Sequence, residues 1–219
     1  MGRDGAKRNM KRFEIITEAD PRVLEIGETV SLVRGGHVTP LAADTLKARR
    51  VTVLSDETLA RAEDNLAPPA DIRRVAIGSD HGGLALKAAL TTALRGRGLA
   101  VDDLGTATVD PVDYPDTASR VAKAVARGEA DAGIVIDGAG IGSAIAANKV
   151  NGVRAAVCHD LTSARYARQH NGANVLSLGA TVVGTSEALE IVNVWLNTPM
   201  TEPRYIRRLT KIRELERGG

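Results

Sequence analysis

The stretch that decides the fold is Gly133-Ile134-Val135-Ile136-Asp137-Gly138-Ala139-Gly140-Ile141-Gly142. Its apolar beginning is typical of a short strand that is buried on both faces of a sheet. An acidic residue and three alternating glycines then lead into a stretch of helical character. A buried strand that passes through a glycine turn into a helix predicts a βαβ unit, and therefore an α/β fold.

Apolar runs and helical stretches alternate on both sides of this segment. The predicted strands are Val75–Ile77, Leu99–Leu104, Gly133–Ile136, Val153–Val157 and Val175–Leu178. The predicted helices are 83–96, 116–128, 142–149, 161–169, 185–197 and a basic one at 203–217. Because parallel neighbours need right-handed crossovers, this alternation predicts a doubly wound parallel sheet in a domain that spans residues 72–219.

The chain before this domain has a different organisation. Residues 1–12 are a basic tail, residues 13–64 form a small α/β appendage, and the linker at 65–71 contains paired prolines that stop helices and strands. The elements predicted in the appendage are strands at Phe13–Ile16, Thr29–Val33 and Val51–Leu54, and a helix at Leu41–Arg50 with Thr39 as its N-cap.

The composition excludes several classes of protein. Of the 219 residues 43% are hydrophobic but only 2% are aromatic, which predicts an aliphatic core and argues against binding single-stranded nucleic acid by stacking. A net charge of +2 indicates no polyanion partner. The sequence shows neither a membrane span nor a signal peptide, and the single Cys158 permits neither a disulfide framework nor a cysteine zinc site. These features predict a cytoplasmic protein.

Polar groups follow the predicted strands at the edge where ligands bind in doubly wound sheets. The groups are Ser79-Asp80-His81-Gly82-Gly83, Asp113-Tyr114-Pro115-Asp116, Asp137 with the glycine loop, and Cys158-His159-Asp160. The glycine loop favours a phosphate or oxyanion on its backbone N–H groups, although a tight turn without a ligand remains an alternative. A dinucleotide site is disfavoured, because Ser143 stands where its third glycine belongs.

Five residues are candidates for the chemistry. Asp137 could remove a proton next to a carbonyl, or it could simply brace the loop that follows it. Among the histidines, His81 adjoins Asp80 at a strand end and His170 ends a helix. Arg204 and Arg208 are four residues apart on one helix face, as a phosphate clamp or as part of a solvated basic face.

Motifs between residues 77 and 208 resemble the ribose-5-phosphate isomerase B family, which includes galactose-6-phosphate isomerase subunits. The motifs are Ser79-Asp80-His81, Leu86-Lys87, Asp113-Tyr114-Pro115, Gly140-Ile141-Gly142, Ile145–Lys149, Arg168–Asn171, Val182-Val183-Gly184 and the Arg204/Arg208 pair. The resemblance implies a three-layer α/β/α sandwich with a five-stranded parallel, Rossmann-like sheet. It also implies a homodimer or dimer of dimers whose active sites take residues from both subunits.

The same resemblance implies an aldose–ketose isomerase of sugar phosphates that works through an enediolate without metal or cofactor. Ribose 5-phosphate to ribulose 5-phosphate is the expected reaction, with His170 assisting the opening of the sugar ring. The residues expected to bind substrate are Asp80, His81, Tyr114, Gly138, Ala139, Gly140, Ile141, Gly142, Asn171, Arg204 and Arg208.

Several positions depart from the family pattern. Asp137 replaces a cysteine base, and Ser143 replaces the glutamate that another branch uses, so Asp137 is our hypothesis for the base. Ala139 replaces a threonine and Thr181 an arginine, which leaves open another sugar phosphate as substrate, or a binding or scaffold protein of low activity.

The appendage has a resemblance of its own. Ile16–Asp20 and Val38–Ala42 are similar to a short unit on enzymes encoded with bacterial microcompartments, such as the ethanolamine-utilisation cobalamin adenosyltransferase. This implies a docking role for residues 13–64 toward a shell or partner enzymes, and a location inside a microcompartment. An ordinary oligomerisation lobe is the alternative.

Overall fold

The computed structural model describes residues 11–55, 66–69, 71–200 and 203–217. The chain divides into two compact units, Met1–Asp64 and Asn65–Gly219. Residues 1–10 of the predicted basic tail 1–12 and the end of the predicted appendage lie outside the described residues, and Arg12 already begins a strand. In the described part of the chain no helix is long and apolar enough to cross a membrane.

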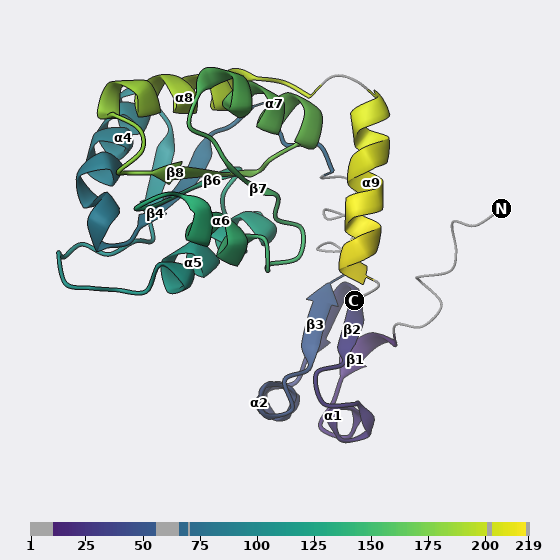
Figure 1. The fold of residues 1–219 in the computed structure, drawn as a ribbon. Helices are drawn as coiled ribbons and strands as arrows, with labels where there is room; N and C mark the ends of the chain where they lie inside the picture. Colours follow the sequence, from purple (N-terminus) through teal and green to yellow (C-terminus); the bar gives the residue numbers. More distant parts are fainter. Residues whose placement is uncertain (1–10, 56–65, 70, 201–202, 218–219) are drawn as a thin grey trace. The chain divides into compact units, whose positions relative to one another are not determined.

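Unit 2 is built on a five-stranded parallel sheet with the strand order β5-β4-β6-β8-β7 (Figure 1). The strands are β4 (Arg74–Ser79), β5 (Ala100–Asp103), β6 (Ala132–Asp137), β7 (Ala155–Val157) and β8 (Val175–Gly179). The chain moves from β4 outward to β5 and then returns to the other side of β4 with β6. The order therefore reverses between β4 and β6, and the crevice at their carboxyl ends is the switch point where such folds bind ligands.

Helices cover both faces of the sheet, so the predicted three-layer sandwich is confirmed (Figure 1). One layer contains α4 (Leu84–Gly96), α7 (Leu161–Asn171) and α8 (Thr185–Asn197), and the other contains α5 (Tyr114–Ala126) and α6 (Ile141–Ala147). Ile134 and Ile136 face the first layer and Val135 the second, as the alternation of a strand requires. Among the described residues the buried core is aliphatic except for Trp195, which is fully buried, and Tyr205, which is 5% exposed.

The element boundaries differ from the prediction where capping residues decide them. Helix α5 begins at Tyr114 because Asp113 is its N-cap and Pro115 fits its first turn. Helix α7 continues to Asn171, where Gly172 ends it with a left-handed backbone, φ 55°. The basic C-terminal helix α9 (Pro203–Arg217) has the predicted bounds.

The described part of the linker is held against unit 2 by two arginines. Arg154 Nη2 donates to the Leu66 carbonyl at 3.0 Å, and Arg168 Nη2 donates to the Pro69 carbonyl at 3.2 Å. Arg168 also donates to the Ala173 carbonyl at 2.9 Å, and burial together with the charge of Arg154 lowers its pKa to about 10. These contacts make the linker a structural part of unit 2.

Unit 1 contains a three-stranded parallel sheet of order β1-β2-β3. Its elements are β1 (Arg12–Ile16), α1 (Asp20–Val23), β2 (Thr29–Val38), α2 (Pro40–Ala48) and β3 (Thr52–Ser55). Thr39 caps α2 as predicted, accepting the Ala42 N–H at 3.4 Å. Strand β2 is longer than expected because the register shift opposite Phe13 and Ile15 lets pairing resume at His37.

Candidate active site

The carboxylate of Asp137 is surrounded by backbone donors of the glycine loop. Its Oδ1 accepts the N–H groups of Ala139, at 3.0 Å, and of Gly140, and its Oδ2 accepts the Ser143 N–H at 2.7 Å. The side chain is 5% exposed. Asp137 therefore has the contacts of the loop-bracing alternative. Each carboxylate oxygen has two lone pairs, so Oδ2 keeps one that these three hydrogen bonds do not use.

Neighbouring elements fix the rest of the loop. Thr181 Oγ1 donates to the Gly138 carbonyl at 2.7 Å, so its hydroxyl braces the loop. His159 Nε2 lies 3.1 Å from the Ala139 carbonyl, a contact that sequence reasoning left without a role. The ring of Tyr114 packs closely on Gly142: a Cβ at this position would lie 2.6 Å from the end of the tyrosine side chain, which would have to move to make room.

Asp80 and His81 follow β4 at the other side of the switch point. Asp80 Oδ1 accepts the N–H groups of Gly82 and Gly83, at 2.9 and 3.1 Å, and thereby caps the short 3₁₀ helix η2 (His81–Gly83). His81 is exposed, and its Nδ1 faces the Val112 N–H at 3.4 Å. The Asp80 carboxylate thus accepts its hydrogen bonds from backbone N–H groups. The His81 imidazole is contacted by Val112, which belongs to the loop before α5.

That loop begins at an ion pair between buried Lys87 and Asp103, whose side chain is exposed. Lys87 is 4% exposed, and its ammonium donates to Asp103 Oδ1 at 2.8 Å and to the Thr106 carbonyl at 2.6 Å. The Thr106 N–H in turn donates to the Ser79 carbonyl at 3.2 Å, at the end of β4. The pair therefore anchors the loop that carries Val112 toward His81.

His170 and Asn171 lie at the end of α7, where two tyrosines meet them. The His170 ring stacks on Tyr166, with the ring centroids 4.5 Å apart, and on Tyr205, at 4.6 Å. Asn171 Nδ2 donates to the Tyr166 carbonyl at 3.0 Å. Neither tyrosine was singled out from the sequence, although Tyr166 and His170 have the spacing that places two residues on one helix face.

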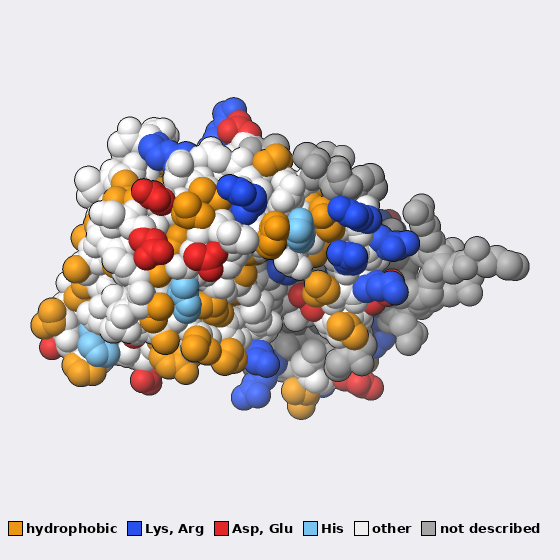
Figure 2. Space-filling view, turned by 45° about the horizontal axis from the view of Figure 1, so that its top comes forward, with side chains coloured by type: hydrophobic (Ala, Val, Ile, Leu, Met, Phe, Trp, Pro, Cys, Tyr) orange, Lys and Arg blue, Asp and Glu red, His pale blue; other side chains and the backbone are white. Residues whose placement is uncertain are grey.

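The basic pair on α9 adjoins this stack. Lys and Arg side chains gather over α9 in Figure 2. The Arg204 guanidinium lies over the Tyr205 ring, 4.9 Å from its centroid, and the Arg208 guanidinium lies 5.7 Å from it. Arg207 and Lys211 are simply exposed. The ring contacts therefore set the predicted pair apart from the rest of the basic face.

The predicted site residues thus form two groups within unit 2. The first, the switch-point group, is Asp80, His81, Tyr114, Asp137 and the loop 138–142. The second, the α7–α9 group, is His170, Asn171, Arg204 and Arg208. Cys158 belongs to neither: it is 1% exposed, and burial raises its pKa to about 11. Among the described residues no cluster of His, Cys, Asp or Glu could hold a metal ion.

A doubly wound sheet that gathers a carboxylate, a glycine loop and histidines at its switch point has the architecture of an α/β enzyme. A family model described as Ribose/Galactose Isomerase matches residues 75–212. The chain belongs to this family.

Individual relatives agree with this assignment. Ribose-5-phosphate isomerase B of Escherichia coli is 45% identical over 145 residues, 66% of this chain and 97% of the relative. D-erythrulose-4-phosphate isomerase of Pectobacterium atrosepticum is 45% identical over 127 residues, 56% of this chain and 82% of the relative.

Solved structures show the same fold. Ribose-5-phosphate isomerase B of Clostridium thermocellum is 50% identical and superposes with a TM-score of 0.65, covering 65% of this chain and 97% of that one. The Mycoplasma genitalium enzyme, solved with bound ribulose-5-phosphate, is 40% identical with a TM-score of 0.64, covering 67% and 97%.

Proposed function

We propose that this aldose–ketose isomerase interconverts ribose 5-phosphate and ribulose 5-phosphate, with Asp137 as the base. The observation that carries the proposal is the carboxylate at the end of β6, in the crevice of the switch point, beside the N-terminus of α6. Its relatives named ribose-5-phosphate isomerase B, of which the chain covers almost the full length, support the choice of substrate.

The reaction needs one proton to move between neighbouring carbons. Asp137 Oδ2 takes the proton from C2 of the open-chain aldose, and the electrons of that bond pass to the carbonyl oxygen to give the enediolate. The same carboxylate oxygen returns the proton to C1, while the hydroxyl proton on O2 moves to O1, so that O2 becomes the ketone oxygen and O1 the new hydroxyl. Because no net oxidation occurs, the residues proposed here suffice for the step.

The remaining roles follow from the two groups. Asp137 already accepts the N–H groups of Ala139 and Gly140. The N–H groups of Ile141 and Gly142 at the start of α6 have no acceptor within the helix, so they bind the enediolate. His170 transfers the proton that opens the sugar ring, and Arg204 and Arg208 bind the phosphate. Asp80, His81, Tyr114 and Asn171 hold the hydroxyls.

Substitution of Asp137 tests the base. Asp137→Asn should lower turnover of ribose 5-phosphate about a thousandfold or more and abolish incorporation of solvent deuterium at C2 of the ribose 5-phosphate formed. Because asparagine also disturbs the loop, Asp137→Cys is the second variant: a thiolate can replace the base and should retain measurable turnover. Full activity of Asp137→Asn would disprove the assignment.

A tetrose phosphate is the second candidate substrate. The relative from Pectobacterium is named D-erythrulose-4-phosphate isomerase, and here Thr181 directs its hydroxyl to the Gly138 carbonyl at a position where we expected an arginine. A coupled assay over tetrose, pentose and hexose phosphates distinguishes the two substrates. A protein that binds these phosphates without converting them would instead be the low-activity scaffold.

We also propose that the appendage docks to a microcompartment shell or to partner enzymes. Unit 1 lies outside the matched residues 75–212 and forms its own compact sheet. Removal of residues 1–64 should then spare turnover and abolish co-sedimentation with shell proteins. If the truncated chain keeps its turnover but loses its oligomeric state, the appendage is an oligomerisation lobe.

A further inference from the structure

Tyr205 is placed to connect the two functional parts of the α7–α9 group. Its ring is 5% exposed and stacks on His170, with centroids 4.6 Å apart and planes inclined by 30°. The same ring lies under the guanidinium of Arg204, at 4.9 Å, and near that of Arg208, at 5.7 Å. Arg204 Nη2 also donates to the Tyr205 hydroxyl at 3.0 Å.

The imidazole has a second aromatic neighbour from its own helix. Tyr166, one turn before His170 on α7, stacks on it at 4.5 Å with the planes only 15° apart. A ring that stacks on two neighbours loses these contacts when it rotates about its side-chain bonds, so its nitrogens stay in one place. Tyr166 is 49% exposed, so this part of the stack borders solvent.

We propose that Tyr205, together with Tyr166, is a positioning residue for ring opening. It holds His170 at a fixed place relative to the two arginines, so that a sugar bound by its phosphate presents its anomeric end to the imidazole. The proposal rests on the function proposed above, in which His170 acts on the closed sugar. There the imidazole takes the proton of the C1 hydroxyl, the C1–O4 bond breaks as C1=O forms, and the imidazolium gives that proton to O4.

Comparing two reactions of the enzyme allows ring opening and proton transfer at carbon to be measured separately. Ribose 5-phosphate is a closed furanose and must be opened before C2 can react. Ribulose 5-phosphate cannot close a five-membered ring, because its O5 carries the phosphate. Exchange of its C1 hydrogen with solvent deuterium therefore needs the base and the phosphate site but not the opening step.

Tyr205→Leu should lower kcat for ribose 5-phosphate about tenfold or more, while C1 exchange of ribulose 5-phosphate at saturation changes less than about twofold. Tyr205→Phe keeps the ring and removes the acceptor of Arg204, so KM should rise for both substrates with kcat nearly retained. An equal fall of both reactions in Tyr205→Leu, or no fall in either, would overturn the proposal.

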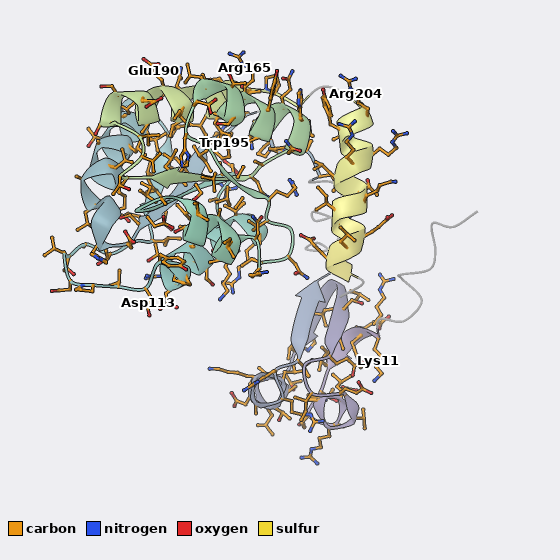
Figure 3. The ribbon with its side chains drawn as sticks, in the orientation of Figure 1. Lys11, Asp113, Arg165, Glu190, Trp195 and Arg204 are labelled. Carbon is orange, nitrogen blue, oxygen red and sulfur yellow. The ribbon has the colours of Figure 1, made fainter. Side chains whose placement is uncertain are left out.

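Tyr166 provides a second pair of variants whose folding is less at risk, because the side chain is half exposed. Tyr166→Leu should reproduce the selective loss of ribose 5-phosphate turnover, and Tyr166→Phe should restore it. Arg165→Ala, an exposed neighbour on α7 (Figure 3), is the matched control and should leave both reactions unchanged. Absence of both reactions in the unsubstituted protein would refute the proposed function itself, a result distinct from either outcome above.

Discussion

At the scale of single residues, Asp137 combines two tasks that sequence reasoning treated as alternatives. Its carboxylate braces the glycine loop through three backbone N–H groups, and one lone pair of Oδ2 is left for a substrate proton. A cysteine at this position could not accept hydrogen bonds of this strength. In this chain the proposed base therefore also contributes to the shape of the loop, and Asp137→Cys should retain only part of the normal turnover.

Cys158 allows a simple test of whether a thiol takes part in the reaction. Because burial raises the pKa of this thiol to about 11, it is protonated at pH 8 and the native protein should react with iodoacetamide very slowly. Turnover of ribose 5-phosphate should be unaffected after such treatment. The Asp137→Cys variant is the control, since the reagent should inactivate it. Rapid inactivation of the unsubstituted protein would point to Cys158 as a functional thiol.

Asp131 should make the stability of unit 2 sensitive to acid. Burial alone raises its pKa, but hydrogen bonds from the Arg74 side chain and from the N–H groups of Arg73 and Arg74 outweigh this, and the pKa is lowered. The folded pKa thus lies below the unfolded one. The stabilisation is complete above the unfolded value of about 4 and is lost as the pH falls through the folded value.

Asp131→Asn should therefore lower the free energy of unfolding by about 1–3 kcal/mol at pH 7, measured by urea denaturation, and by much less near pH 3. The matched control is Asp71→Asn, which removes an exposed pair with Arg73 and should cost less than about 1 kcal/mol. An equal cost for Asp131→Asn at both values of pH would contradict the linkage.

At the scale of elements, the sequence was sufficient for the sheet and its helices. Their apolar runs and helical stretches are regular, and cap residues such as Thr39 and Gly172 are local signals. It was insufficient for α1, which has only four residues, and for the extension of β2, which depends on pairing across a register shift with β1. The first is barely more than one turn, too short for a repeating pattern, and the second depends on a tertiary contact.

The candidate site, too, could be predicted from the sequence only in part. Asp80 and the glycine loop directly follow predicted parallel strands, which placed both at the carboxyl edge of the sheet. That β4 and β6 are neighbours, with the switch point between them, comes from the structure. The stack around His170 could not be predicted, since Tyr205 comes from a separate helix and only packing brings it to α7. The contacts of Thr181 and His159 with the loop carbonyls are likewise tertiary.

The linker yields a prediction at this scale. A chain that begins at residue 65 should keep the stability of unit 2, whereas one that begins at residue 70 loses the carbonyls that Arg154 and Arg168 use. Leaving two largely buried guanidiniums with fewer acceptors should cost about 2–5 kcal/mol and lower turnover, because Arg168 lies just before His170 on α7. Thermal denaturation of the two chains, side by side, measures the difference; equal midpoints would show that the linker is dispensable.

At the scale of the whole molecule, we expect a dimer whose active sites take residues from both subunits, with Arg204 and Arg208 binding the phosphate across the dimer interface. The variants Asp137→Asn and Arg204→Ala should each be nearly inactive as homodimers. In a mixed dimer one site would contain neither substitution, so co-expression should restore about a quarter of the normal activity. No recovery in purified mixed dimers would indicate that each site is built from a single chain.

The chain contains three tyrosines, and every one of them lies at a candidate site group: Tyr114 against Gly142, and Tyr166 and Tyr205 against His170. A protein isotopically labelled at tyrosine alone would give spectra in which every ring signal originates beside the proposed chemistry. Substrate titrations could then be followed at both groups simultaneously, and three phenylalanine variants would assign the signals. Because aromatic residues are so scarce, the tyrosine signals of the protein itself would report whether substrate occupies the two site groups.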